Sequence, residues 1–342
     1  VMLIGQKFPV QERVASGVTY REMLSEFGFL GAAVVSFLVV LQLDQFFPGH
    51  MTIWIILGVV MALAMGLYTR SLGRPLMFIL ILIMAPLATT EIGTDGWIAG
   101  IMESVVSFHG GWILVYTSVI MMVLRFFAGP IVHKLSPLGL LIVSAVLAIA
   151  GLLALSGASG VVMIFGAATL YALGKTFFWP TMLGIVSEQT PKGGALTLNS
   201  VSGIGMLAVG VLGFPYIGAL QEQKVVQEVA KVEQVAKVDG FLKDGEISED
   251  YLDQNSIYYG TIKYPTLKAE KIDELVKSAP AGQQAGITEA IETAKEGSAQ
   301  KALANMAVFP AIMLVVFIGL FLYFRSKGGY KPVDLTAGGG EH

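Results

Sequence analysis

Eight runs of apolar residues, each close to the length of a membrane-spanning helix, make up about half of this chain. A spanning helix needs about 20 apolar residues because each residue adds about 1.5 Å of rise across the bilayer core. The runs cover residues 27–47, 52–68, 76–98, 112–132, 138–155, 161–186, 196–220 and 304–324. We therefore predict an all-α integral membrane protein.

Composition agrees with this fold class. Charged residues make up 14% of the chain and hydrophobic residues 54%, whereas soluble domains carry about 25% charged residues. The net charge of −3 predicts no nucleic-acid partner. The absence of cysteine excludes disulfides and thiolate metal sites. Val1 starts neither a signal peptide nor an ordinary protein, so we expect a longer polypeptide whose amino-terminal half precedes this chain.

The distribution of basic residues predicts the orientation in the membrane, because short cytoplasmic loops collect Lys and Arg. The short loops 47–51, 99–111 and 156–160 contain neither residue. The basic residues lie on the alternate side, at Lys7, Arg13, Arg21, Arg70, Arg74, Lys134, Lys192, Arg325, Lys327 and Lys331. Both ends of the chain are therefore predicted to be cytoplasmic.

The polar segment 221–303, between the last two runs, is predicted to be an extracytoplasmic insert. Residues 221–240, 266–279 and 287–306 have the Ala, Glu and Lys content or the apolar spacing of helices. Residues 255–265 are aromatic and β-branched, which is typical of a short strand or a packed loop. We predict a small, mainly helical module. It is a spacer, a partner-docking surface or a substrate-binding element.

Lys175 lies near the middle of the run 161–186, which is otherwise free of formal charge. A charge at that depth costs about 2.5 to 3.5 kcal/mol on insertion scales. The ammonium is therefore expected either to face a polar cavity or to form a structural salt bridge that sets helix register.

Two carboxylates occur in the run 76–98. Glu91 and Asp95 are four residues apart, so they share a face on a continuous helix. We predict a cavity role for Glu91, with Lys175 as its charge partner. Asp95 either lines this cavity or is exposed to water at the outer membrane interface, beside Trp97.

Three further residues are candidates for the wall of a solute cavity. Tyr171 and Trp179 flank Lys175 by about one turn and can stack on a ligand, or they are ordinary core and lipid contacts. Asn199 offers an amide to a cavity, or it caps the cytoplasmic end of its helix.

A resemblance to a known family emerges after the fourth run. Gly129, Ile131, His133 and Lys134 lie between two runs on the predicted cytoplasmic side. This segment resembles the conserved cytoplasmic loop of the major facilitator superfamily, with His133 in place of the family's acidic residue. The turn at 191–193 and the glycines and proline of the run 196–220 are similar to further features of the carboxyl half of that family.

The resemblance implies that the last six runs form a six-helix half bundle and that the first two are an additional helix pair. Gly129, His133 and Lys134 would then form a gating loop, and the missing amino-terminal half would complete the site. In the predicted organisation, residues 1–26 are a cytoplasmic linker with an amphipathic helix and residues 27–70 are the two additional helices. Residues 71–220 form five helices of the carboxyl half, and residues 221–303 are the insert. The final helix covers residues 304–325, and a cytoplasmic tail covers residues 326–342.

We therefore expect a secondary active transporter of the bacterial cytoplasmic (inner) membrane. It would move a small polar solute by alternating access, as a proton- or sodium-coupled symporter. No run presents paired histidines, a nucleophile with a base, or a metal cluster, so we expect neither an enzyme nor a cofactor or metal. The rival hypothesis is a membrane-embedded sensor or assembly protein whose external helical module binds a partner.

Overall fold

The structure is a computed structural model that describes residues 12–103, 109–236, 238, 240–243 and 245–333. The chain divides into two compact units. The first comprises the described parts of Val1–Ala85, Trp179–Val211 and Leu320–His342, and the second comprises those of Pro86–Phe178 and Leu212–Gly319.

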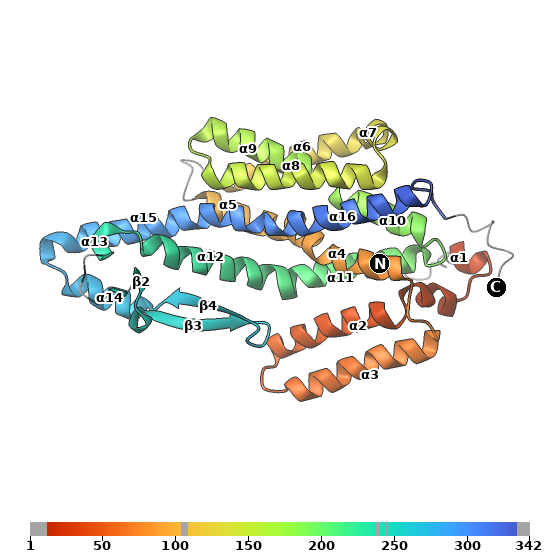
Figure 1. Ribbon diagram of the computed structural model, residues 1–342, viewed down its shortest axis with the longest axis horizontal. Helices are drawn as coiled ribbons and strands as arrows, with labels where there is room; N and C mark the ends of the chain where they lie inside the picture. The colour runs from red at the N-terminus through yellow and green to blue at the C-terminus, as the bar shows by residue number, and fades with distance from the viewer. Residues whose placement is uncertain (1–11, 104–108, 237, 239, 244, 334–342) are drawn as a thin grey trace, which may run out of the picture. The chain divides into compact units, whose positions relative to one another are not determined.

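Within the described part of the chain, seven apolar helical segments are long enough to cross a membrane. The chain is therefore an integral membrane protein. The segments are Tyr20–Phe46 (α2), Met51–Thr69 (α3), Pro75–Met102 (α4, η1, α5), Pro137–Gly157 (α8), Val161–Gln189 (α9, α10), Gly194–Val229 (α11, η2, α12) and Gly282–Ser326 (α15, α16) (Figure 1). Individual bounds are Pro75–Ala88 for α4, Thr94–Glu103 for α5, Val161–Lys175 for α9, Phe178–Gln189 for α10, Gly194–Ala208 for α11, Phe214–Val229 for α12, Ala281–Met306 for α15 and Val308–Ser326 for α16.

The predicted fourth span, 112–132, is wrong as a single helix. Helix α6 (Gly111–Phe126) has 16 residues and ends where Phe127 leaves helical geometry, with φ −100° and ψ 17°. At about 1.5 Å per residue this helix is shorter than an average bilayer core. Pro130 lies in the first turn of the separate helix α7 (Ala128–Lys134), where its missing N–H is tolerated. The predicted gating loop at Gly129, His133 and Lys134 is therefore part of a short helix.

The described part of the predicted linker, 1–26, contains a short helix and the start of a long one. After α1 (Glu12–Ala15), helix α2 begins with a capping box of Thr19 and Glu22 and continues through a kink at Gly28. Gly28 has φ +58°, and a Cβ there would lie 2.1 Å from the backbone nitrogen of Gly73. Only glycine allows this close approach of the chain. Met23 is buried in the first unit.

In the second unit, helices α8 and α9 pack through glycines. A Cβ on Gly151 would lie 2.5 Å from Tyr171 Cα, and one on Gly174 would lie 2.4 Å from the backbone nitrogen of Ala148. Small residues of this kind let helix backbones approach closely in membranes. The contact holds α9, and with it Lys175, against α8.

We expect Gly174→Ala to lower the free energy of unfolding by about 1 to 3 kcal/mol, because the new methyl group overpacks this contact. Gly166→Ala is the matched control on α9, since its Cβ would meet nothing within 4 Å. The control gains only helix propensity, worth up to about 1 kcal/mol. Unfolding of both variants in detergent measures the difference. Equal stability of the two variants would contradict the packing described above.

The segment between α12 and α15 forms a small module with its own apolar core. Its buried residues are Val226, Val229, Val235, Phe241, Ile247, Ile272, Leu275, Ile287 and Ile291. The predicted helices at 266–279 and 287–306 are present as α14 (Ala269–Ser278) and α15. Helix α13 (Glu233–Ala236) and the turn η3 (Glu249–Tyr251) are short (Figure 1).

Two antiparallel hairpins interrupt this mainly helical module. They are β1 (Leu242–Lys243) with β2 (Glu246–Ile247), and β3 (Leu252–Ile257) with β4 (Ile262–Leu267). The second hairpin contains the aromatic, β-branched segment that was predicted to be a strand or a packed loop. Tyr258 and Tyr259 form its turn with positive φ, and the Tyr258 hydroxyl donates to the Leu212 carbonyl.

Candidate functional site

Lys175 ends helix α9 in the second unit, and its side chain is fully buried. Its ammonium forms an ion pair with Asp95, which lies in the first turn of α5. The nitrogen also lies 5.1 Å from the centre of the Tyr171 ring, within cation–π range. A carboxylate and an aromatic face therefore surround a charge that apolar surroundings alone would not tolerate.

A second charge pair lies in the same unit. Arg125 Nη2 is 2.8 Å from Glu91 Oε1, and Arg125 Nε donates to the Thr176 carbonyl at 3.0 Å. The Glu91 side chain is 9% exposed, whereas that of Arg125 is 41% exposed. The guanidinium therefore links α6 to two other segments and still reaches the surface of this unit.

The charge partner predicted for Lys175 was Glu91, and the structure gives the lysine Asp95 instead. The π-helix η1 (Thr89–Gly93) lies between α4 and α5. Hydrogen bonds in a π-helix connect residues i and i+5, so η1 interrupts the α-helical repeat on which the prediction was based. Glu91 and Asp95 form ion pairs with different cations, Arg125 and Lys175.

The π-turn has identifiable causes in the sequence. Pro86 lies inside α4 and cannot donate to the helical ladder. Thr90 Oγ1 donates to the Pro86 carbonyl at 2.8 Å, and the Thr90 carbonyl accepts a hydrogen bond from the Tyr171 hydroxyl. Side chains thus satisfy backbone groups where the regular helix is interrupted, as membrane burial requires.

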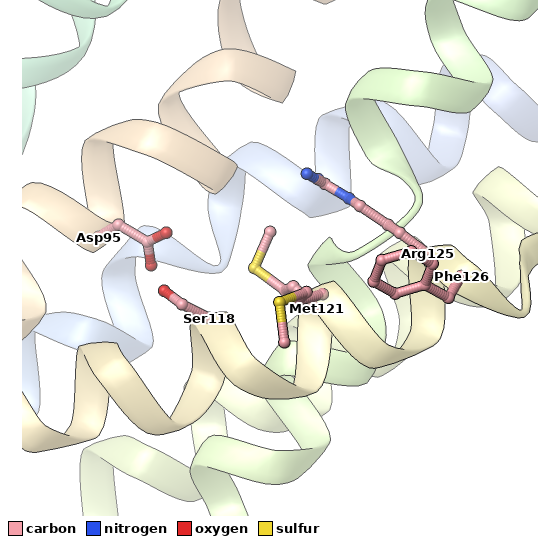
Figure 2. Close-up of a pocket in the computed structure, with 6 residues that line it drawn as sticks. Asp95, Ser118, Met121, Arg125 and Phe126 are labelled. Atoms are coloured by element: carbon pink, nitrogen blue, oxygen red, sulfur yellow. The ribbon is translucent and has the colours of Figure 1, made fainter.

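An open cavity of about 510 Å³ lies between these charges. It is lined by Asp95, Ser118, Met121, Met122, Arg125 and Phe126. Five of these six residues come from one face of α6, because their spacing follows the helical repeat. Figure 2 shows the Ser118 hydroxyl beside the Asp95 carboxylate, with Arg125 and Phe126 further along α6.

Three contacts hold α6 against α9 and the residue after it in the second unit. The Tyr116 hydroxyl is 2.7 Å from Thr169 Oγ1 on α9, and the Tyr116 ring packs edge-on against Phe165. At the other end, Arg125 bonds to the Thr176 carbonyl just after α9. The cavity wall is therefore tied to the helix that carries Lys175.

The structure brings Lys175, Glu91, Asp95 and Tyr171 together in the second unit. The other two predicted cavity residues belong to the first unit, where Trp179 is half-buried on α10 and Asn199 is exposed on α11.

The remaining predicted positions, those of the gating loop, lie on α7. Gly129 and Lys134 are exposed there, and the side chain of His133 lies outside the described part of the structure. Neither Gly129 nor Lys134 lines the cavity.

Arg125 was missed by reasoning from the sequence, although a signal was present. It is a formal charge inside the apolar run 112–132, which is the same criterion that singled out Lys175. It lies seven residues before the end of that run, away from its middle.

Among the described residues, no group of three or more His, Asp or Glu side chains is arranged to hold a metal ion. No protein family, curated protein or solved structure matches this chain.

Proposed function

We propose that this chain is part of a secondary active transporter of the major facilitator type, which moves a small polar solute across the bacterial cytoplasmic membrane by alternating access. In this proposal both chain ends are cytoplasmic, the insert is extracytoplasmic, and an amino-terminal half completes the solute path. The coupling ion is a proton or sodium.

The observation that carries the proposal is the cavity face of α6. Asp95 on α5 and Arg125 on α6 both line an open cavity, and Arg125 is the one charged residue in the sequence of α6. Lipid does not accept such charges, so intramembrane ionisable groups face a bundle interior or a water-filled cavity and mark solute or ion paths. A cavity of this size also suits a small solute.

Interrupted helices add support. In the second unit, a Cβ on Gly213 would lie 2.6 Å from Thr89 Oγ1, and one on Gly96 would lie 3.2 Å from the Phe214 ring. Thr89 belongs to the π-helix η1 and Gly213 to the π-helix η2 (Val209–Gly213), so the first contact joins the interrupted regions of two different spans. Transporters commonly bind solutes and ions where spanning helices are interrupted.

The ion pairs suggest how coupling works. A proton on Asp95 or Glu91 would remove the partner charge of Lys175 or Arg125, and the freed cation would favour a different packing of α5, α6 and α9. Such a switch needs two arrangements that the proton distinguishes energetically.

The rival function, a sensor or assembly protein, is favoured by one observation: the module between α12 and α15 folds around its own apolar core. In that case the spanning helices are a scaffold. Removing charges from the cavity would then leave the activity unchanged.

Uptake by membrane vesicles tests the proposal. The complete polypeptide is assayed against labelled sugars, amino acids, organic anions and organic cations, and the solute that accumulates is followed in the double variant Asp95→Asn, Lys175→Met. We expect uptake to be lost, although no charge is left unpaired in this variant. The control is Lys271→Met with Glu274→Gln, which removes an exposed ion pair of 2.7 Å from α14. Uptake at the wild-type rate by the cavity variant refutes the transport role of the site.

A further inference from the structure

We infer that the cavity on α6 binds an extended zwitterion, with the cationic group of the solute at Asp95, the anionic group at Arg125 and an apolar chain between them. This inference rests on the proposed transport function and names the class of solute. Its basis is the order of groups along the cavity wall: acid and hydroxyl at one end, methionines in the middle, guanidinium and aromatic ring at the other.

Both charged groups have capacity left for a ligand. Lys175 contacts Oδ1 of Asp95, and the Asp95 side chain remains 22% exposed. The Ser118 hydroxyl lies beside it as a further polar contact (Figure 2). Arg125 uses Nε and Nη2 for its two bonds within the protein, so N–H groups on Nη1 are left for a carboxylate.

Charge balance favours a solute without net charge. The two ion pairs, Lys175 with Asp95 and Arg125 with Glu91, sum to zero. A net anion would compete with Glu91 for Arg125 and leave an excess negative charge in surroundings of low dielectric, and a net cation would do the reverse at Asp95. A zwitterion adds one charge of each sign and preserves neutrality.

The spacing of the groups selects an extended zwitterion over a compact one. Asp95 lies beside Ser118, and Arg125 follows Ser118 by seven residues on α6, a rise of about 10 Å. Because the arginine side chain is long and flexible, the distance between its guanidinium group and the Asp95 carboxylate can be shorter than this rise. The amine and carboxylate of an α-amino acid share one carbon and cannot reach both groups. An ω-amino acid with several methylene groups can.

The middle of the wall suits a methylene chain. Met121 and Met122 line it between the two polar ends, and Phe126 closes it next to Arg125. Methionine side chains are flexible and polarizable, so they adapt to an unbranched apolar segment. Burial of each methylene group then adds favourable free energy without adding charge.

Four probes of similar size test the inference on the purified complete polypeptide in nanodiscs, by calorimetric titration. They are ε-aminocaproate, its isomer norleucine, caproate and hexylamine. We expect ε-aminocaproate to bind at least about tenfold more tightly than each of the others, because each comparison removes a charge-assisted hydrogen bond. Norleucine has the same formula and charges, so it isolates the effect of charge spacing.

Paired variants assign each end of the solute. In Asp95→Asn with Lys175→Met, ε-aminocaproate should bind no better than caproate. In Glu91→Gln with Arg125→Gln, it should bind no better than hexylamine. Each double variant removes one positive and one negative charge, so net charge is kept.

Several results would overturn the inference. They are equal binding of caproate, hexylamine or norleucine by the wild-type protein, no binding of any probe, or a preference that survives both double variants. Failure of the transport proposal is recognised separately. If some other labelled solute is taken up and its uptake is lost in the Asp95 and Lys175 double variant, transport stands and only the zwitterion is rejected.

Discussion

Lys175→Met is expected to lower the free energy of unfolding by about 3 to 5 kcal/mol, because it leaves the Asp95 carboxylate without its partner in a largely buried site. Asp95→Asn should cost a similar amount, since the lysine ammonium is fully buried. The double variant Asp95→Asn, Lys175→Met should recover most of the loss, because neither charge is then left unpaired. The two losses are therefore expected to be strongly non-additive.

Unfolding of the single and double variants in detergent gives the coupling energy of this pair. The matched comparison is the double-mutant cycle of Lys175→Met with Glu91→Gln. Glu91 pairs with Arg125 and not with Lys175, so these two substitutions remove groups from different ion pairs. We expect its coupling energy to be the smaller of the two. A larger coupling of Lys175 to Glu91 than to Asp95 would show that the arrangement of charges around η1 is wrong.

Much of the fold follows from hydropathy, because the bilayer imposes a length on every helix that crosses it. Seven of the eight predicted spans correspond to long apolar helical segments. The exception, 112–132, stops at Phe127 because the backbone turns out of the helix just before Gly129 and Pro130. Hydropathy records only apolar content, which continues through this break.

The charge pairing was less predictable for a geometric reason. The prediction assumed a regular α-helix between Glu91 and Asp95, and the π-turn of η1 changes the helical repeat in this segment. Pro86 signals an irregularity in the sequence, but not its type. Lys175 itself was recognisable because one formal charge in an apolar run needs a partner. Which carboxylate supplies that partner depends on rotations of the helices that spacing does not encode.

The module between α12 and α15 was also only partly predictable from the sequence. Its helices were predicted from Ala, Glu and Lys content, and the aromatic segment at its centre was predicted to be a strand or a packed loop. The structure contains the β3 and β4 hairpin there, paired from Leu252 with Leu267 to Ile257 with Ile262. The shorter hairpin of β1 and β2 has two residues in each strand, too few for a periodic pattern to reveal.

The transport proposal requires that α6 presents Ser118 and its neighbours to a water-filled solute path at membrane depth. Cysteine labelling tests this directly, because the chain contains no native cysteine. Ser118→Cys places a thiol on the cavity wall, and Val119→Cys places one at the adjacent exposed position outside it. A charged methanethiosulfonate reagent needs water and a thiolate to react, whereas a thiol in apolar surroundings stays protonated.

The decisive measurement is the labelling rate of both variants in sealed right-side-out and inside-out vesicles. We expect the Ser118→Cys variant to react about tenfold or more faster than the Val119→Cys variant, because only its thiol ionises in water. Alternating access predicts that this reaction occurs from both sides of the membrane, and that a transported solute slows it. Equal rates for the two variants, or labelling of neither, would contradict a water-filled path along α6.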